Sequence, residues 1–433
     1  MTLTGTLPRQ AAQSTPRFLP VPERRYFAIV ESLSHDERVV RLDLIDATDE
    51  RFSGAEFKRT SGIFRRMWQQ AFESQPSVSQ ISTELSTFKG GLLETDVSDL
   101  PTWSSVWPEA SNWAEVVFGS SFEIREVRPV PIGDSRRLDR IFGMAAWPSA
   151  TADRVATVLG ATPRLAAFAT FDVGQGAASA LVDAQGFAFI YSDVGAAFGG
   201  NARTRPTNLK YCVCEQPVVV LSHWHQDHWA GVDFEPRLLR SQWIAPRQAI
   251  GKTQSQFGAA ILEAGGDILI VKRSSKPRVS IGQRTQEILI DYCRGNSIND
   301  SGIVLTVRRL ADKLLWIFPG DADYSMFCPQ PGRLVGLVAT HHGAKPRQPG
   351  AVPSPGANAY HRLVYSFGVG NIYGHPHPVA LNAHLGASWS SAKVRQTSGR
   401  PGTPARGPVA VGWTQPPRQL FHLPHCLEVP IVS

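Results

Sequence analysis

Four side chains of the kinds that bind divalent metal ions stand together directly after an apolar segment. Residues Val218–Leu221 read VVVL, and the motif His223-x-His225-x-Asp227-His228 follows after one residue. The apolar run predicts a buried strand, whose end is a rigid platform. The turn beyond it would let His223 and His225 face one ion, and Asp227 and His228 a second. Imidazole nitrogen and carboxylate oxygen suit zinc, and also manganese or iron.

The alternative is a polar surface loop with chance histidines. Three His and one Asp within six residues, directly after an apolar run, favour the metal site over that alternative.

The motif is the signature of the metallo-β-lactamase superfamily, and two later segments extend the resemblance. Trp316–Asp323 resembles the superfamily strand that ends in an Asp bridging two metals, and Val338–Gly343 resembles the strand end that carries a late histidine ligand. The resemblance implies that Asp321 bridges the two metals and that His341 or His342 is the late ligand. His341, nearer the strand end, is favoured. The implied fold is an α/β, αββα sandwich.

Three more segments resemble the hydrolase domain of ComEC-type DNA-uptake proteins. Phe171–Gly176 contains DVGQG, Asn299–Leu305 resembles an Asn/Ser-bearing strand, and Tyr365–Pro378 contains N-x-Y-G-H-P-H. The resemblance covers residues 165–413. It implies a site role for Asn371, His375 and His377, and roles beneath the site for Asn299 and Ser301.

The chain also departs from the family pattern. Ala177 follows DVGQG where the family usually has Asp, and Ala344 stands where the family has Ser. No histidine lies between His228 and His341, so the usual third histidine of the first metal is missing. The first metal would then keep an open position, which a catalytic site needs, although a weak first site is the competing outcome. The ligands left to it are His223, His225 and Asp321.

The two-metal arrangement implies a hydrolytic mechanism. Two ions roughly 3.5–4 Å apart can share a hydroxide, because metal binding lowers the pKa of water to about 7. That metal-bound hydroxide would attack phosphorus or a carbonyl carbon. His375 or His377 could contact phosphate oxygens or protonate the leaving group, work that suits imidazole near neutral pH. A structural turn is the alternative for both. Asp227 is assigned to catalysis as well as to the metal.

Charge and histidine are both concentrated late in the chain. The chain has 433 residues and a formal net charge of +7, of which residues 331–433 carry +8 and residues 1–330 about −1. Of the twelve histidines, only His35 precedes position 223. Lys345 and Arg347 follow the late histidines and predict attraction of a polyanionic substrate, although a solvated basic face is the alternative. Asp172 and Asp193 each precede Val-Gly and are expected to shape loops beneath the site, Asp193 by orienting a ligand histidine.

The five cysteines are odd in number and scattered, which fits a reducing cytoplasm better than a disulfide framework. The pair Cys212 and Cys214 is interpreted as ordinary strand or loop residues, because its spacing is tight for a zinc site and no second pair exists. His422 and His425 are expected not to bind metal. No run of about 18 apolar residues predicts a membrane span.

The elements expected to hold these residues fall into three regions. Residues 1–22 predict a disordered tail. Residues 23–160 are expected to form an N-terminal α+β region of unknown function, with strands at Tyr26–Leu33 and Val39–Ile45 and a helix at Lys58–Phe72. Residues 161–433 contain the predicted hydrolase domain, where short apolar runs bounded by Gly, Pro and Asp predict buried strands and Gln254–Ala264 and Val379–Leu385 predict helices. Residues 396–407 predict a loop. The strands are expected at Leu165–Phe171, Ser179–Val182, Phe187–Tyr191, Pro217–Leu221, Ile268–Val271, Glu287–Ile290, Ile303–Val307, Leu314–Phe318, Leu334–Ala339 and Val409–Trp413.

The predicted function is a metal-dependent hydrolase that cleaves phosphodiester bonds, acting as a nuclease on DNA or RNA with two divalent ions, zinc or manganese. The family's proteins are membrane-embedded, so a chain without a predicted span implies a stand-alone cytoplasmic enzyme. Two alternatives remain open. One is hydrolysis of a small phosphodiester or ester, and the other is a non-catalytic metal-binding scaffold or interaction protein. In each case the N-terminal region could bind a protein partner, select the substrate or form a lid.

Overall fold

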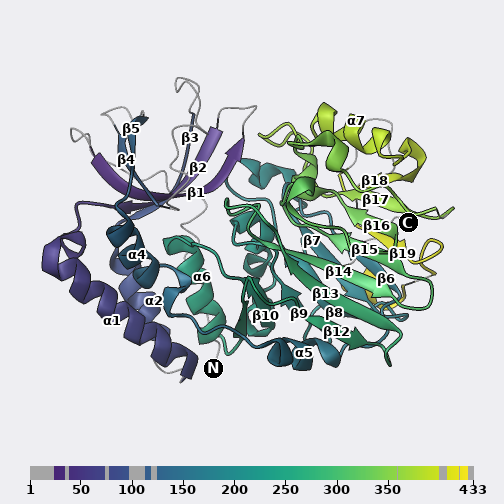
Figure 1. The fold of residues 1–433 in the computed structure, drawn as a ribbon, viewed down its shortest axis with the longest axis horizontal. Coiled ribbons are helices and arrows are strands. Elements are labelled where there is room, and N and C mark those ends of the chain that lie inside the picture. Colours follow the sequence, from purple (N-terminus) through teal and green to yellow (C-terminus); the bar gives the residue numbers. More distant parts are fainter. Residues whose placement is uncertain are drawn as a thin grey trace. The chain divides into compact units, whose positions relative to one another are not determined.

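The computed structural model describes residues 24–34, 39–73, 78–96, 113–118, 124–357, 359–398, 407–418 and 420–427. They form two compact units, one made of Met1–Pro148 with Gln248–Gly265 and one made of Ser149–Arg247 with Gly266–Ser433. Figure 1 shows the chain coloured from the N-terminus to the C-terminus. The tail expected at 1–22, and residues 399–406 of the expected loop, lie outside the described residues.

The first unit is an antiparallel sheet with helices. Its strand order is β3-β2-β1-β4-β5, and the predicted strands and the predicted first helix of this region are confirmed. A small apolar cluster that includes Tyr26, Leu42 and Val116 lies against this sheet. The elements of the unit are β1 (Arg24–Ser34), β2 (Val39–Asp46), α1 (Gly54–Glu73), α2 (Val78–Thr87), β3 (Gly90–Asp96), β4 (Ala114–Phe118), β5 (Ile124–Pro129), α4 (Ile132–Ile141) and α6 (Lys252–Glu263).

Helix α6 joins the first unit although it lies far along the sequence. The buried carboxylate of Asp43 on β2 accepts a hydrogen bond from the Thr253 backbone N–H at 2.7 Å, and the Lys252 ammonium donates to the Phe88 carbonyl at 2.6 Å. Conversely, α5 (Ala152–Gly160) belongs to the second unit, where it packs on β12. In the structure, the first unit ends at Pro148 and also includes residues 248–265. The sequence prediction placed the boundary between the N-terminal region and the hydrolase domain at residue 160.

The second unit contains two seven-stranded mixed sheets. The first sheet has the order β11-β10-β9-β8-β7-β6-β19, and the second has β12-β13-β14-β15-β16-β17-β18. The strands are β6 (Ala167–Thr170), β7 (Ala178–Val182), β8 (Ala188–Val194), β9 (Val218–Val220), β10 (Gln242–Pro246), β11 (Asp267–Val271), β12 (Arg278–Ile281), β13 (Gln286–Tyr292), β14 (Ile303–Arg309), β15 (Leu314–Phe318), β16 (Arg333–Val338), β17 (Arg362–Tyr365), β18 (Val394–Gln396) and β19 (Val409–Gly412). Besides α5, the unit contains α7 (Pro378–Gly386) and α8 (His422–Leu427).

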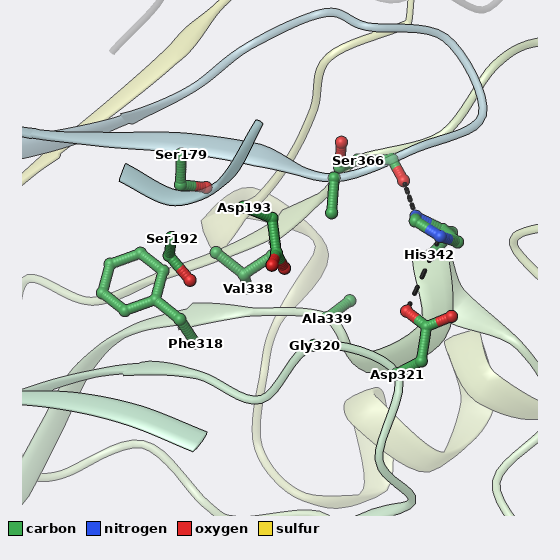
Figure 2. Close-up of a pocket in the computed structure, with 11 residues that line it drawn as sticks. Ser179, Ser192, Asp193, Phe318, Gly320, Asp321, Val338, Ala339, His342 and Ser366 are labelled. Atoms are coloured by element: carbon green, nitrogen blue, oxygen red, sulfur yellow. Dashed lines mark hydrogen bonds and ion pairs between the residues drawn. The ribbon is translucent and has the colours of Figure 1, made fainter. Parts of the chain in front are cut away.

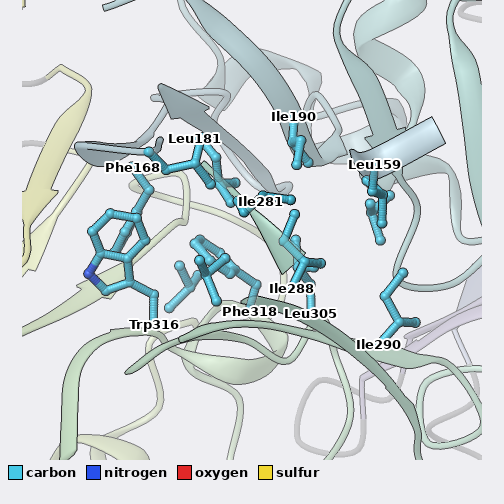
Figure 3. Close-up of a cluster of buried hydrophobic side chains, with 14 of the residues drawn as sticks. Leu159, Phe168, Leu181, Ile190, Ile281, Ile288, Ile290, Leu305, Trp316 and Phe318 are labelled. Carbon is cyan, nitrogen blue, oxygen red and sulfur yellow. The ribbon is translucent and has the colours of Figure 1, made fainter. Parts of the chain in front are cut away.

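One apolar core holds the two sheets face to face. Phe168 from the first sheet makes edge-on contacts with Trp316 and Phe318 from the second, with ring centroids 5.4 and 4.9 Å apart. Figure 3 shows this layer, in which Leu181 and Ile190 meet Ile288 and Leu305. A second cluster lies on the opposite side of the second sheet, where residues of α7 pack against it. The predicted α/β class, an αββα sandwich, is confirmed.

Parallel pairing gathers the chemistry at one edge of the sandwich. β8, β9 and β10 are parallel neighbours in the first sheet, as are β15, β16, β17 and β18 in the second. The carboxyl ends of parallel strands meet at one edge, where α/β sheets usually bind ligands. The residues there are Asp193 in β8, His223 after β9, Asp321 after β15, His341 and His342 after β16, and Ser366 after β17. None of the described helices combines the length and apolar composition needed to cross a bilayer.

Candidate metal centre

The HxHxDH motif lies in the tight loop that leaves β9. His225 has extended backbone, and Gln226–His228 form a short 3-10 turn. The side chains of His223 and His228 are essentially inaccessible to solvent. A histidine buried to this degree needs a partner for each ring nitrogen, because an unsatisfied buried polar atom costs about 1–3 kcal/mol.

Asp321 stands between two groups of ligand-type atoms. One group contains His223, His225 and Asp321, and the other contains Asp227, His228, Asp321 and His342; within each group the ligand atoms lie within 4.8 Å of one another. In the second group, Asp321 Oδ1 lies 3.0 Å from His228 Nε2, and Asp227 Oδ2 lies 3.1 Å from His342 Nε2. These separations are close to the roughly 3.3 Å expected between N and O ligands of a tetrahedral zinc ion.

The outer ring nitrogens of three histidines are held by neighbouring groups. The Nδ1 atom of His228 lies 2.9 Å from Asp193 Oδ2, that of His342 lies 3.0 Å from the Ser366 carbonyl, and that of His223 lies 3.0 Å from Ser222 Oγ. Such contacts fix the orientation and tautomer of metal-binding histidines. Each leaves Nε2 directed at the cluster.

The inward-facing atoms lack hydrogen-bond partners among the described residues. They are Nε2 of His223, Nε2 of His225, Nε2 of His228 and Oδ1 of Asp321, all buried. Native proteins leave few buried polar atoms unsatisfied, and an ion is one explanation when several converge. The donor set, imidazole nitrogen with carboxylate oxygen, is the chemistry that zinc and manganese use. The residues present therefore fit two divalent cations sharing Asp321.

The electrostatics of the cluster agree with this fit. Burial lowers the pKa of His223 well below its usual value and lowers that of His225 to about 4, so both are neutral, the form that binds metal. Burial also opposes a charge on His228, but Asp321, Asp193 and Asp227 outweigh it and raise the pKa of His228 well above its usual value. Burial opposes ionisation of Asp321 too, and the surrounding histidines overcome it and hold its pKa well below its usual value. A divalent cation would replace the proton that balances these carboxylates.

Left-handed backbone places several residues of the site. His341 and His342 have φ of 47° and 55°, and Asp193 has φ of 59°. Such conformations are uncommon outside glycine and cluster at functional sites. Gly195 and Gly320 are required by close approach. A Cβ on Gly195 would lie 1.7 Å from the Asp227 carbonyl oxygen, and one on Gly320 would lie 2.4 Å from Ser222 Oγ.

The two late histidines face different oxygens of Asp321. His342 is buried, and its Nε2 lies 3.6 Å from Oδ1, on the side of the second ligand group. His341 is 29% exposed, and its Nε2 lies 3.5 Å from Oδ2, the oxygen that His223 Nε2 approaches to 3.7 Å. The geometry therefore groups His342, rather than the favoured His341, with Asp227 and His228, and leaves His341 at the rim.

His375 lies next to these histidines. Its ring centroid is 5.4 Å from that of His341 and 6.4 Å from that of His342. Its Nδ1 lies 3.1 Å from the Gln175 amide nitrogen. Burial lowers the pKa of His375 well below its usual value, and the nearby His341 and His342 lower it further.

A pocket beside the cluster is drawn in Figure 2, where His342 contacts both Asp321 and the Ser366 carbonyl. Its lining residues are Ala177, Ser179, Ser192, Asp193, Phe318, Gly320, Asp321, Val338, Ala339, His342 and Ser366.

The GHPHP segment supplies supporting residues as well. His377 Nδ1 accepts from the Val379 backbone N–H at 3.1 Å and so caps α7. The Asn371 side chain closes the loop on itself, because its amide donates to the Gly368 and His375 carbonyls and its oxygen accepts from the Tyr373 and His375 N–H groups. Both side chains are therefore used by the backbone around His375.

The two predicted substrate cations differ. The Arg347 guanidinium pairs with buried Asp300 at 2.6 Å, and its backbone N–H donates to Asp323 at 2.7 Å, so it anchors the loop after the late histidines. Lys345 is exposed and makes no ion pair with a described residue.

Three residues expected beneath the site lie in turns. Asp172 Oδ1 accepts from the Gly174 N–H at 3.2 Å within the DVGQG loop. Asn299 and Ser301 lie in the turn before β14. Asn299 Oδ1 is buried and makes no hydrogen bond with the part of the chain that the structure describes, and the Ser301 N–H donates to the Ser297 carbonyl. This turn touches the motif, because the Ile303 N–H donates to the Ser222 carbonyl at 2.8 Å.

Sequence reasoning missed several supporting residues: Gln175, Ser222, Asp300 and Ser366. Ser222 is the most connected of them. Its hydroxyl lies 2.8 Å from Asp193 Oδ2 and 3.2 Å from His228 Nδ1, in addition to its contact with His223. Its position immediately before the motif was the available signal. Nothing in the sequence marks Ser366, whose carbonyl contacts His342 from another strand.

No family model and no curated protein matches the chain. Solved structures similar to it include MEM-A1, a subclass B3 metallo-β-lactamase from a soil metagenome library, at 15% identity and a TM-score of 0.23, covering 40% of this chain and 68% of that one. Another is a Cronobacter sakazakii metallo-β-lactamase with an HARLDQ motif, at 17% identity and 0.23, covering 42% and 68%. Zn²⁺-bound PqqB from Methylobacterium extorquens is similar at 8% identity and 0.22, covering 34% and 64%. Likeness at this level leaves the function to be argued from the site.

Proposed function

We propose that this chain is a metal-dependent hydrolase of the metallo-β-lactamase superfamily that cleaves phosphodiester bonds, with DNA or RNA as its substrate. The observation that carries the proposal is that buried ligand atoms of His223, His225 and His228, which make no hydrogen bond with the described residues, converge on Asp321. A purely structural cluster would be expected to satisfy these atoms internally.

The site residues divide into holders and reactants. His223, His225 and Asp321 would hold one cation, and Asp227, His228 and His342 would hold the second with the other oxygen of Asp321. Two divalent cations there would supply Lewis-acid stabilisation of a phosphate oxygen and a water of lowered pKa.

The chain's own residues then act on the substrate. His375 Nε2 would donate to a phosphate oxygen or to the leaving group, and the contact between its Nδ1 and Gln175 supports this role by orienting the ring. Lys345 offers an exposed positive charge for an anionic substrate beside the site. Gln175 and Asn371 keep His375 in position through its side chain and backbone.

The remaining basic residues give less support for a long polyanion. Arg362 is buried at the start of β17, whereas the site lies beyond the end of that strand, and its guanidinium lies over the Tyr360 ring. The indole N–H groups of Trp224 and Trp229 donate to the Pro246 and Trp224 carbonyls, so these buried rings are packing residues rather than platforms for bases. Arg362, Trp224 and Trp229 therefore add no support for nucleic acid over a small phosphodiester, the second candidate substrate, and a substrate panel must separate the two.

The test is hydrolysis of linear DNA, RNA and bis-p-nitrophenyl phosphate by protein loaded with zinc or manganese. The double variant Asp227→Ala, His228→Ala should lose activity on every substrate. The matched control Asp312→Ala, His361→Ala removes the same residue types away from the motif and should retain it. Turnover of the small ester alone would reject the nuclease assignment and keep the hydrolase. Metal binding without turnover would support the scaffold alternative, and activity in the Asp227/His228 variant would reject the site.

A further inference from the structure

A second cluster of metal-ligand side chains lies in the second unit, and it shares no residue with the His/Asp centre. It brings together Cys212 and Cys214, from the segment before β9, with His422 and Cys426 from α8. Cys214 Sγ lies 3.6 Å from Cys426 Sγ, and His422 Nε2 lies 3.3 Å from Cys214 Sγ and 3.2 Å from Cys426 Sγ. One ligand atom from each of the four residues lies within 4.8 Å of every other.

The separations match shared coordination rather than a disulfide. A disulfide would bring the two sulfurs to about 2.05 Å. Tetrahedral zinc, with Zn–S near 2.3 Å and Zn–N near 2.0–2.1 Å, sets sulfur atoms about 3.8 Å apart and sulfur and nitrogen about 3.6 Å apart. Three thiols and one imidazole are a ligand set that structural zinc sites use, and the cluster contains no carboxylate.

The local structure holds the four residues without help from a metal. His422 and Cys426 are four residues apart on α8, which places them on one helix face. The Tyr191 hydroxyl accepts from the Cys212 N–H at 2.9 Å and donates to the Cys212 carbonyl at 3.1 Å. Leu423 and Leu427 on α8 are buried. The site is therefore built by the fold.

The β7–β8 turn holds the imidazole. The His422 ring stacks on Phe187 with centroids 3.9 Å apart, and the His422 N–H donates to the Gln185 carbonyl at 3.0 Å. Between those residues, a Cβ added to Gly186 would lie 3.1 Å from the Leu423 nitrogen, so α8 sits directly on this turn.

We propose that Cys212, Cys214, His422 and Cys426 bind one zinc ion in a closed structural site that is separate from the His/Asp centre. Binding deprotonates the three thiols, and the three protons pass to solvent. Four protein ligands leave no open position, so this ion stabilises structure and takes no part in hydrolysis. It ties α8 to the segment that leads into β9, nine residues before His223. The proposal stands whether or not the chain is a hydrolase.

Cobalt substitution tests the proposal in the whole chain. Thiolate ligands give Co²⁺ a strong near-ultraviolet charge-transfer band, and the His/Asp centre contains no sulfur, so the band reports this cluster alone. The natural chain loaded with Co²⁺ should show the band, and added zinc should abolish the band by displacing the cobalt. As-purified protein should lose one zinc equivalent in Cys214→Ser and in Cys426→Ser. The control Cys328→Ser, an exposed cysteine elsewhere, should keep both the band and the zinc.

Absence of the cobalt band in the natural chain would overturn the proposal without reliance on any variant. So would a disulfide between Cys214 and Cys426 found by mass spectrometry of unreduced protein. Unchanged zinc content in both serine variants would overturn it as well. The variant Asp227→Ala, His228→Ala should retain the band, which separates this site from the proposed hydrolytic centre.

Discussion

Replacing Asp193 with Asn should weaken the second metal position while leaving the backbone in place. Asp193 has φ of 59°, a left-handed conformation that Asn tolerates better than most residues. Its Oδ1 accepts from the Ser222 backbone N–H at 2.7 Å, and its Oδ2 lies 2.8 Å from the Ser222 hydroxyl and 2.9 Å from His228 Nδ1. The substitution therefore removes one oxygen without removing the side chain.

The amide cannot reproduce both contacts. If its oxygen keeps the Ser222 N–H, its NH₂ group faces His228 Nδ1, and the imidazole must then carry its proton on Nε2. A protonated Nε2 cannot bind a metal. Loss of such a supporting contact typically costs 10–100-fold in metal affinity, about 1.4–2.8 kcal/mol. The loss should fall on the ion held by His228, because Asp193 contacts that histidine directly.

The assay is a competition titration with a chromophoric chelator, which measures metal affinity. The metal content after dialysis gives the number of ions that the protein retains. Asp193→Asn should retain one tightly held His/Asp-centre ion and bind the second 10–100-fold more weakly. Asp312→Asn, which removes a carboxylate paired with Arg309 elsewhere in the unit, should behave as the natural chain. Two ions bound with unchanged affinity in Asp193→Asn would refute the role assigned to this contact.

Two further predictions concern single histidines. His375→Gln should lower kcat with little change in metal content, because His375 is assigned to substrate rather than to metal; a loss of metal equal to the loss of rate would contradict that assignment. His384 is buried, and burial lowers its pKa to about 4. In the unfolded chain the His384 imidazole binds a proton near pH 6.5, whereas in the folded chain it does so only near pH 4. The free energy of unfolding therefore falls as the pH drops through this window, by about 2 kcal/mol between pH 7 and pH 5. The measurement is denaturant unfolding of chelator-treated protein at pH 7 and pH 5. Between these pH values, the free energy of unfolding should fall by about 2 kcal/mol less in His384→Gln than in the natural chain. An equal fall in both would refute the assignment.

The elements that carry strong local patterns were predictable from the sequence. The apolar run before His223 is a strand, and the segments before Asp321 and His341 are strands that end at the same edge. Short strands without such runs escaped notice. β17 contains only Arg362–Tyr365 and β18 only Val394–Gln396, and neither alternates clearly. Their place in the sheet comes from pairing with neighbours, which no local pattern encodes.

Residue roles were harder to predict than elements, because they depend on the third dimension. Asn371 and His377 belong to a motif that suggests substrate contact, yet the Asn371 amide holds the backbone of that motif and His377 Nδ1 holds the first turn of α7. The cluster of three cysteines and His422 was also hard to predict, because its members are far apart in the sequence. Cys212 and Cys214 lack a nearby second pair, and their partners His422 and Cys426 lie more than 200 residues later. Tertiary packing alone brings them together.

The two adjacent late histidines both approach Asp321, although no histidine lies between His228 and His341 in the sequence. Two consecutive residues in an ordinary strand would point to opposite faces, and one of them would leave the site. Here both have positive φ, and their Nε2 atoms approach different oxygens of Asp321, His342 at 3.6 Å from Oδ1 and His341 at 3.5 Å from Oδ2. His341 thus stands on the side where His223 and His225 provide only two imidazoles. With 29% of its side chain exposed, His341 would offer an ion held there a third imidazole from the solvent-facing side of the site.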